Sequence, residues 1–501
     1  PAGSRFGCLM VQRLQPVNSL SALLKGVVDA PVPEQLRVTG LSLDSRSIEH
    51  GDLFVGVPGL EADGRSYVSR AVAGGAGAVL VEARDGTGGQ YEVPCYQVRN
   101  LRQYIGLIAS RFYGFPSRLL CVIGFTGTNG KTTCAGLTAQ ALEALGRRSG
   151  VIGTVGVGRF DSLRPISLTT PDAISLQAEL AQMVDAGLDS VCIEISSHAL
   201  DQARVRGVDI DAAVFTNLSR DHLDYHGSMD AYAASKFLLF QDHGVRAAII
   251  NTSDPYGAEF VRAGIPAKVW TYGSDNLANV YPEKSEVFPT GIRLRLATPV
   301  GSISFQVSLL GRLNVMNLVA VVTALLALEY SSAAIERAMS TLRPVPGRME
   351  LVSESDAPVH VVVDYAHTPA ALEQALDSLR EHTPQRIWCV FGCGGERDPG
   401  KRPEMGAIAD RLADNIVLTN DNPRAEDPLR ILRQIESGIE RHKAVRIPDR
   451  REAIEFAIRQ ADSGDLILVA GKGHETTQVV GSERIPFSDQ TVVANLLEEI
   501  C

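Results

Sequence analysis

A short segment rich in glycine and threonine, Thr126 to Thr133, has the residue types of a phosphate-binding loop. It reads Thr-Gly-Thr-Asn-Gly-Lys-Thr-Thr. Glycines let backbone N–H groups surround phosphate oxygens, the lysine reaches the terminal phosphates, and a hydroxyl can bind Mg²⁺. Phe125 stands where the usual spacing has its first glycine, with Gly124 and Gly127 nearby. An ordinary turn with an exposed lysine is disfavoured, because an apolar strand-like run precedes the segment and a helix-like run follows it.

Two further segments have the residue types of a metal site. Glu194 comes directly after the apolar run 190–193, and a carboxylate at the end of a buried strand beside a phosphate loop suits Mg²⁺. By itself it could equally cap a helix or lie on the surface. The segment 217–226 follows the run 212–216 and contains His222. It could supply metal ligands and phosphate contacts, or be a solvated loop, and its histidine spacing matches no zinc motif.

Four polar segments in the last third of the chain each follow an apolar run. They mix Asp, Glu, Arg, Lys, His and Gly, and they are 364–369, 392–401, 421–424 and 471–475. Each alone could be a turn. Four such loops at successive strand ends are typical of a pocket for a small zwitterion.

The elements that position these residues indicate an α/β fold. We expect strands at 119–125, 191–195, 212–216, 360–363, 387–391, 416–419 and 466–470, and helices at about 131–145, 229–241 and 319–329. Alternation of strands and helices favours parallel sheets. Open α/β sheets bind ligands outside the carboxyl ends of their strands, where the polar segments of this chain lie.

Length and composition limit the function classes. The 501 residues suggest about three domains, which we place at 1–100, 101–344 and 345–501. A net charge of -10 argues against a general nucleic-acid binder. No apolar run approaches the ~20 residues of a membrane span, and no signal peptide is recognisable. We therefore expect a cytoplasmic monomer with no nucleic-acid partner and no membrane insertion.

Together these motifs resemble those of the Mur ligases, the ATP-dependent amide ligases of peptidoglycan precursor synthesis. The resemblance runs from Leu43 to about Asp489. It rests on the loop Thr126–Thr133 without its first glycine, on Glu194 and His222, on Asn314 and Asn317 in the segment 311–317, on Arg348 in Gly347-Arg348-Met349, and on Asp364 in Asp364-Tyr365-Ala366-His367. It is strongest to the members that extend UDP-N-acetylmuramoyl-L-alanyl-D-glutamate with meso-diaminopimelate.

The resemblance implies three α/β domains: an N-terminal UDP-binding domain, a central P-loop ATPase-like parallel-sheet domain, and a C-terminal Rossmann-like domain that binds the amino acid. It implies ATP binding by Gly127, Thr128, Asn129, Gly130, Lys131, Thr132, Thr133, Asn314, Asp364 and His367. The uridine end would contact Leu43, Ser45, Leu60, Glu61 and Ala62, and the muramoyl-dipeptide Thr169, Thr170, Ser196, Gln202 and Arg204. Related enzymes often carry His-Gln at 60–61.

The amino acid would lie against Arg397, Asp421, Asn422, Pro423, Arg424, Gly471 and Glu475. Diaminopimelate has one more carboxylate than lysine, and Arg424 could grip it bidentately. Diaminopimelate-adding relatives carry the same tetrapeptide, Asp421 to Arg424, which lysine-adding relatives usually lack. Arg397 should bind the other carboxylate, and Glu475 with Asp421 could meet an ammonium group.

The implied mechanism has two steps. The D-glutamate carboxylate attacks the γ-phosphate of ATP, and the incoming amine then attacks the acyl phosphate and expels phosphate. Lys131 would stabilise the transferring phosphoryl group, and Arg348 would serve the nucleotide. Thr132 and Glu194 would hold one Mg²⁺, and His222 with Lys236 modified to N6-carboxylysine would help hold a second. Composition alone would leave Lys236 on a helix surface.

Three other functions remain open at this point. A lysine-adding ligase of the same family differs in the amino-acid loops. Folylpolyglutamate synthetase shares the ATP domain, but the segments 196–198 and 421–424 argue against it. A non-enzymatic P-loop switch would need no acceptor pocket, and the four polar strand ends disfavour it.

Overall fold

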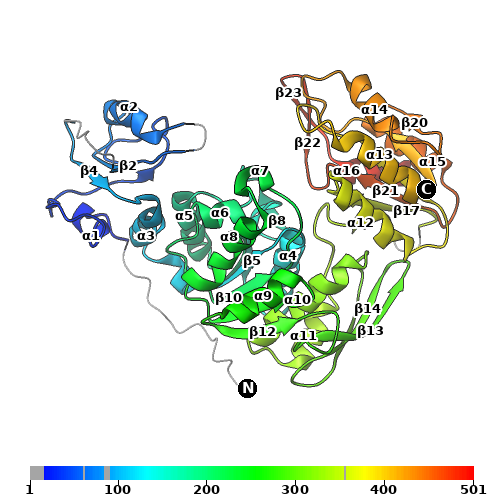
Figure 1. The fold of residues 1–501 in the computed structure, drawn as a ribbon, viewed down its shortest axis with the longest axis horizontal. Helices are drawn as coiled ribbons and strands as arrows, with labels where there is room; N and C mark the ends of the chain where they lie inside the picture. Colours follow the sequence, from blue (N-terminus) through cyan, green and yellow to red (C-terminus); the bar gives the residue numbers. More distant parts are fainter. Residues whose placement is uncertain (1–15, 60–61, 84–90, 355–356, 501) are drawn as a thin grey trace. The chain divides into compact units, whose positions relative to one another are not determined.

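The computed structural model describes residues 16–59, 62–83, 91–354 and 357–500 (Figure 1). The chain forms two compact units. The first contains the described residues up to Tyr272 together with Thr323–Ser331, and the second contains Gly273–Val322 and the described residues from Ser332 onward. The division falls within helix α10, Leu313–Ala327. Among the described residues, no helix has the length and apolar composition needed to cross a membrane.

The N-terminal sheet of the first unit has four parallel strands in the order β1-β2-β3-β4. They are β1 Leu41–Ser42, β2 Leu53–Gly56, β3 Ala78–Glu82 and β4 Cys95–Val98, and the helices beside them are α1 Leu20–Leu23, η1 Gly64–Tyr67, α2 Val68–Ala73 and α3 Arg102–Phe112. Alternate strand residues point to opposite faces. Val55 therefore packs with Ile105 of α3, and Phe54 packs with Val68 of α2.

The larger sheet of the first unit has eight strands in the order β12-β11-β10-β5-β9-β6-β7-β8, parallel from β12 to β6 and antiparallel beyond. Its strands are β5 Cys121–Thr126, β6 Ser149–Gly153, β7 Gly156–Arg159, β8 Ser162–Arg164, β9 Ser190–Glu194, β10 Ala212–Phe215, β11 Ala247–Asn251 and β12 Lys268–Tyr272. The helices are η2 Pro116–Leu119, α4 Lys131–Ala144, α5 Ala173–Asp185, α6 Ser197–Asp201, α7 Leu223–His226, α8 Met229–Asp242 and α9 Pro255–Ala263. Strand β5 lies between β9 and β10, so the loops after all three meet at one edge.

The second unit contains a six-stranded sheet in the order β16-β17-β21-β18-β19-β20, parallel except for β16 (yellow to red in Figure 1). Its strands are β16 Glu350–Leu351, β17 His360–Asp364, β18 Ile387–Phe391, β19 Asn415–Leu418, β20 Val445–Arg446 and β21 Leu466–Ala470. One face packs on α12 Pro369–Arg380, α13 Lys401–Leu412 and α14 Pro428–Glu436, and the other on α15 Arg450–Gln460 and α16 Asp489–Ile500. Cys389 faces the first set and Val390 the second, as in a doubly wound Rossmann-like sheet.

The predicted α/β class with parallel sheets is confirmed, and the predicted strands 387–391 and 466–470 match β18 and β21 residue for residue. The domain limits at 100 and 344 stay predictions. Sequence patterns did not reveal the antiparallel sheet β13-β14-β15 (Tyr281–Phe288, Gly291–Ala297, Ile303–Val307), the hairpin β22-β23 (Thr477–Val480, Glu483–Pro486), or helix α11, Ser332–Met339. Helix α10 begins six residues before the predicted start at 319.

Candidate active site

The predicted phosphate loop leaves the end of β5 and enters α4. Gly130 is the N-cap of α4 with φ 85°, and the side chain of Lys131 donates from Nζ to the carbonyl oxygens of Gly127 and Thr128, both at 2.9 Å. Gly127 has φ 148°, and a Cβ there would lie 1.9 Å from Thr216 Oγ1, so only glycine fits. The lysine charge and the helix N-terminus therefore act on the same loop, as anion binding requires.

The loop after β10 braces the phosphate loop. Asn217 accepts the backbone N–H of Asn129 at its Oδ1 (2.9 Å) and that of Thr128 at its carbonyl oxygen (2.8 Å). Thr216 donates from Oγ1 to the carbonyl oxygen of Asn129 at 2.6 Å. These contacts come from the loop that follows the neighbouring strand β10, and they hold the phosphate loop in shape without using the Lys131 charge.

Glu194 is the last residue of β9 and is fully buried. Its Oε2 accepts from the hydroxyls of Thr132 (2.8 Å) and Thr154 (3.1 Å), and its Oε1 accepts from the Thr154 N–H (2.7 Å). A Cβ at Gly153 would lie 2.1 Å from Oε1, so this glycine makes room for the carboxylate. A hydroxyl beside a carboxylate is the oxygen donor set that Mg²⁺ prefers, and it fits the predicted ion.

Lys236 is buried, with 1% of its surface exposed, although composition alone would leave it on a helix surface. It lies on α8, donates from Nζ to the carbonyl oxygen of Gly127 at 2.8 Å, and sits 4.5 Å from the centre of the Tyr232 ring. Burial, and then the charge of Lys131, lower the pKa of Lys236 well below its usual value. The environment therefore favours the neutral amine.

His222 precedes α7 in the left-handed conformation (φ 51°), 3.5 Å from Asp221 and about half exposed. Its ring lies edge-on to that of His198, with the ring centres 4.8 Å apart. His226 stacks on Tyr232 at 5.0 Å. Within the described residues, no group of three or more His, Cys, Asp and Glu side chains is arranged to hold a metal ion. The second predicted Mg²⁺ site therefore depends on the proposed modification of Lys236.

The residues predicted to hold the muramoyl-dipeptide are joined by hydrogen bonds at the end of β9. Thr170 donates from Oγ1 to the carbonyl oxygen of Glu194 (2.8 Å) and accepts from the Ser196 N–H (3.1 Å). Arg204 donates to the Thr170 carbonyl oxygen (2.9 Å) and to Gln202 Oε1 (2.6 Å). The fold thus brings four of these five residues into one network beside the phosphate loop.

Thr154, which the sequence did not single out, and Tyr225, from the predicted segment 217–226, complete this network. The Thr154 hydroxyl donates to the Glu194 carboxylate. Its oxygen also lies 3.1 Å from the hydroxyl oxygen of the predicted residue Thr169. The Tyr225 hydroxyl accepts from Gln202 Nε2 at 3.2 Å. Thr154 carries no motif, so sequence alone had no means of finding it.

Three of the residues predicted for the uridine end lie in loops beside the N-terminal sheet. Leu43 and Ser45 follow β1, where Leu43 packs partly against the core, and Ala62 is exposed. Leu60 and Glu61 lie outside the described residues.

The remaining nucleotide residues belong to the second unit. Asn314, 3% exposed, donates to the Leu310 carbonyl oxygen (2.6 Å) and accepts from Asn317 (2.9 Å). Asp364 ends β17 and accepts the N–H groups of Met349 (2.7 Å) and Ala366 (2.8 Å).

An aromatic and cationic cluster surrounds Tyr365. The Arg348 guanidinium lies 4.6 Å from the centre of the Tyr365 ring, and the His367 ring lies 4.5 Å from it. Burial lowers the pKa of His367.

The predicted amino-acid loops lie at the carboxyl ends of β21, β18 and β19. Arg424 has φ 53° and donates from Nη1 to the Gly395 carbonyl oxygen at 2.6 Å, while Arg397 is exposed in the same glycine-rich loop. Strand β22 holds the Asp421–Arg424 loop, because the Arg424 N–H donates to Val479 (3.1 Å) and the Gly481 N–H donates to Arg424 (2.8 Å).

The adjoining loop after β21 carries Gly471 and Glu475. Gly471 has φ 114°, and a Cβ there would lie 2.6 Å from Asp421 Oδ2. Asn422 donates from Nδ2 to Glu475 Oε2 at 2.9 Å. The next residue in the chain, Pro423, is buried. The fold therefore brings together Asp421, Asn422, Gly471 and Glu475.

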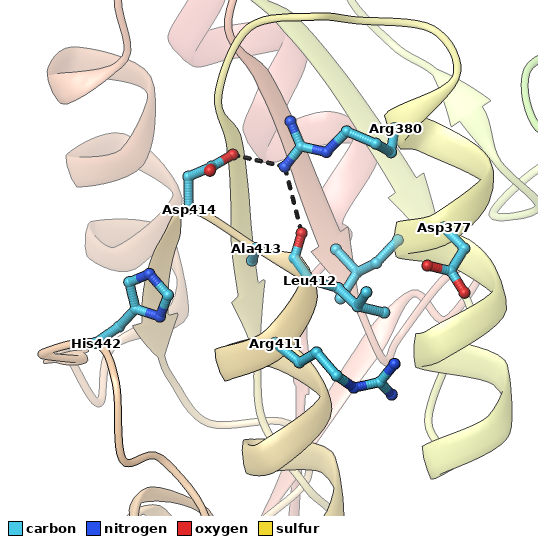
Figure 2. A pocket seen from close by; sticks show the side chains of 8 residues that line it. Asp377, Arg380, Arg411, Leu412, Ala413, Asp414 and His442 are labelled. Atoms are coloured by element: carbon cyan, nitrogen blue, oxygen red, sulfur yellow. Dashed lines mark hydrogen bonds and ion pairs between the residues drawn. The ribbon is translucent and has the colours of Figure 1, made fainter.

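A pocket of about 230 Å³ lies at the other end of the same strands, between the ends of α12 and α13 (Figure 2). Arg380 donates there to Asp414 (2.6 Å) and to the Leu412 carbonyl oxygen (3.3 Å). None of the residues predicted for a site lines it. Both arginines of the pocket are paired with carboxylates, Arg380 with Asp414 and Arg411 with Glu373, so the pocket offers little to an anionic ligand.

Comparisons with known proteins show to which family this chain is similar. Residues 37–113 match the family model described as "Mur ligase family, catalytic domain", 125–325 match "Mur ligase middle domain", and 347–473 match "Mur ligase, glutamate ligase domain". The chain is 46% identical over 463 residues to the UDP-N-acetylmuramoyl-L-alanyl-D-glutamate–2,6-diaminopimelate ligase of Coxiella burnetii, covering 90% of this chain and 94% of the relative. It is 46% identical over 458 residues to the Pseudomonas aeruginosa ligase of that name, with 91% and 94% covered. A solved structure of a ligase with this name matches with a TM-score of 0.73 and 37% identity, over 97% of this chain and 99% of that one.

Proposed function

The chain belongs to the Mur ligase family, and from that premise we propose that it joins meso-diaminopimelate to UDP-N-acetylmuramoyl-L-alanyl-D-glutamate in an ATP-dependent reaction. The product would serve peptidoglycan precursor synthesis, and through it cell wall biogenesis, cell shape and cell division. The observation that carries the proposal is the 46% identity, over nine-tenths of the chain, to ligases named for this reaction.

The phosphate loop would hold ATP. Lys131 already lies over the loop carbonyl oxygens, and its ammonium group would turn to the transferring phosphoryl group. Catalysis here consists of positioning and charge neutralisation, because phosphoryl transfer needs little covalent help from the protein. The D-glutamate carboxylate attacks the γ-phosphorus, the bond to ADP breaks, and an acyl phosphate forms. Arg204, Gln202 and Thr170 would hold the muramoyl-dipeptide for this attack.

The oxygen ligands for Mg²⁺ would be Thr132 and Glu194, with His222 and modified Lys236 near a second ion. A bound Mg²⁺ would neutralise the charge that develops on the phosphates. Burial supports the modification of Lys236, because the neutral amine can add to CO₂ with loss of one proton, forming a carbamate. The ionised carbamate is an oxygen ligand for a hard cation, which an ammonium group cannot be.

In the second step the amine of the incoming amino acid attacks the acyl carbon, and inorganic phosphate leaves. Arg424 and Arg397 supply cations for the two carboxylates of diaminopimelate, while Glu475 and Asp421 supply anions for ammonium. This set favours diaminopimelate over lysine, because lysine would leave one arginine without its carboxylate. Asn314, Asp364, His367 and Arg348 would serve the nucleotide.

A panel of amino acids in a coupled ADP-release assay tests the proposal. We expect release only when ATP, UDP-N-acetylmuramoyl-L-alanyl-D-glutamate and an amino acid are all present, and much faster release with meso-diaminopimelate than with L-lysine. Equal rates with L-lysine would contradict the assignment of meso-diaminopimelate as the substrate, but they would still support an amide ligase. Release without any amino acid would favour the nucleotide switch, and release with a folate and glutamate would favour folylpolyglutamate synthetase.

A further inference from the structure

Lys472 is a fully buried lysine in the loop that follows β21. Its Nζ donates to Glu475 Oε2 (2.8 Å), the Thr477 carbonyl oxygen (2.8 Å) and Asn422 Oδ1 (3.1 Å). An ammonium group has three N–H donors, and these three contacts use all of them. Lys472 therefore has no donor left for a substrate, and its effect must pass through its partners.

Two of those partners belong to the proposed amino-acid site. Asn422 accepts at Oδ1 from Lys472 and from the Val479 N–H (2.9 Å), which leaves its Nδ2 to donate to Glu475 Oε2 at 2.9 Å. Only one orientation of the Asn422 amide therefore satisfies all three of these hydrogen bonds. Lys472, Asn422 and Glu475 form a closed triangle of hydrogen bonds that joins the loop after β19 to the loop after β21.

Lys472 also acts on the pKa of the Glu475 carboxyl group. Burial alone would raise the pKa of Glu475, but the hydrogen bond and charge of Lys472, with the Asn422 amide, lower it below the usual value. Both side-chain contacts of Glu475 fall on Oε2. About a third of the Glu475 side chain is exposed, so the carboxylate remains accessible to a ligand.

We propose that Lys472 is the positioning residue of the amino-acid site, holding Asn422 and Glu475 in the orientation that receives an ammonium group of the incoming amino acid. This inference rests on the proposed function, and it assigns a role to a residue that does not contact the substrate. Without Lys472 the Asn422 amide can turn, and Glu475 loses its counter-ion and takes up a proton more readily. An amino acid with a distal ammonium group should then bind weakly.

Lys472→Met tests the proposal in the ligase reaction of the full chain. We expect the KM for meso-diaminopimelate to rise by on the order of 30-fold or more, because a buried carboxylate and amide lose their partner. The kcat and the KM values for ATP and the UDP-linked dipeptide should stay within about threefold, since the phosphate loop is untouched. Lys472→Gln keeps donors to Glu475 and Thr477, so its KM for meso-diaminopimelate should rise less than that of Lys472→Met. The glutamine variant also provides the test if the methionine variant does not fold.

Asp465→Asn is a matched control at the opposite end of the same strand. Asp465 is 2% exposed, and it accepts from Trp388 Nε1 (3.0 Å) and from the Asp462 N–H (3.0 Å). Its loss should lower Tm without a selective change in the KM for diaminopimelate.

An unchanged KM for diaminopimelate in folded Lys472 variants would overturn the role of Lys472 and leave the proposed function standing. A lower Tm with no selective change in the KM for diaminopimelate, as expected for Asp465→Asn, or a parallel loss of kcat and all three affinities, would make Lys472 merely structural and would also overturn the proposal. The unmodified protein is measured first: if it uses no diaminopimelate, the proposed function fails, and this inference falls with it.

Discussion

The phosphate loop comes from one continuous segment, Thr126 to Thr133, whereas the amino-acid loops come from segments spread over residues 392–475. Both lie at the carboxyl ends of parallel strands. In the phosphate loop the lysine contacts carbonyl oxygens three and four residues away. In the amino-acid loops, Lys472 reaches Asn422, fifty residues earlier in the chain.

This difference has consequences for what a mutation does. A local loop is shaped by its own glycines and by the neighbouring strand, so one side-chain charge can be removed without disturbing the backbone. The amino-acid loops depend on each other through β22 and through Lys472, so changes there should alter the affinity and selectivity for the amino acid first. Four predictions test this contrast, from the largest expected effect to the smallest.

Removal of the charge in the phosphate loop should have the largest effect. In Lys131→Ala the ligase rate should fall by about a thousandfold or more, because no other group replaces the ammonium at the phosphates. Tm should hardly change, since Asn217 and Thr216 still brace the loop. Lys284→Ala, at an exposed lysine, is the control. Activity near that of the control would show that this loop is not the phosphate site.

Lys236 should give the next largest effect. Lys236→Ala should be nearly inactive, and added short carboxylic acids should partly restore it, because they can supply the oxygen ligand of the lost carbamate. Lys131→Ala is the matched control, since a carboxylic acid cannot replace a cation there. The readout is ADP release over a range of acetate concentrations. An alanine variant that is active at low bicarbonate would refute the modification.

Arg424 should affect selectivity more than rate. Loss of a desolvated arginine partner costs about 2–5 kcal/mol, roughly 30- to several-thousand-fold in discrimination. Arg424→Ala and Arg424→Lys should therefore lose most of the preference for meso-diaminopimelate over L-lysine, measured as the ratio of kcat/KM values. Arg433→Ala, at an exposed arginine of α14, should keep it. A retained preference in both Arg424 variants would place the distal carboxylate elsewhere.

Sequence patterns predicted the phosphate loop, Glu194 at a strand end, and the strands β18 and β21, because each signal lies within a few neighbouring residues. They did not predict the burial of Lys236, since helix α8 has no pronounced apolar face to show which side is buried. Thr154 was missed for a related reason, because its partner Glu194 is forty residues away in the chain. Lys472 lies inside the predicted segment 471–475, but its contact with Asn422, fifty residues earlier, could not be predicted from neighbouring residues.

The smallest effect should come from Asp410, which lies near the end of α13 that is farther from the amino-acid loop 392–401. Burial would raise the pKa of Asp410, but the N–H groups of Arg441, Glu440 and His442 and the His442 ring lower it to about 2, from 3.8. The folded pKa lies below the unfolded one, so the carboxylate stabilises the fold above about pH 4, and this contribution is lost as the pH falls toward 2. Asp410→Asn should lower the free energy of unfolding by about 2 kcal/mol at pH 7, with unchanged selectivity.

Tryptophan fluorescence during urea unfolding can measure this change in the second unit alone. The chain has two tryptophans, and Trp388 lies in β18 of the six-stranded sheet, so a Trp270→Phe background isolates its signal. The difference in the free energy of unfolding between the unmodified protein and Asp410→Asn should shrink as the pH is lowered from 5 to about 3. Over this range the Asp410 carboxylate progressively loses its stabilising contribution. A constant difference over that range would mean that the side-chain shape, and not its charge, stabilises the turn. A loss of selectivity for diaminopimelate in Asp410→Asn would show that the two ends of the six-stranded sheet are coupled. It would contradict the expectation that only residues in the amino-acid loops control the choice of amino acid.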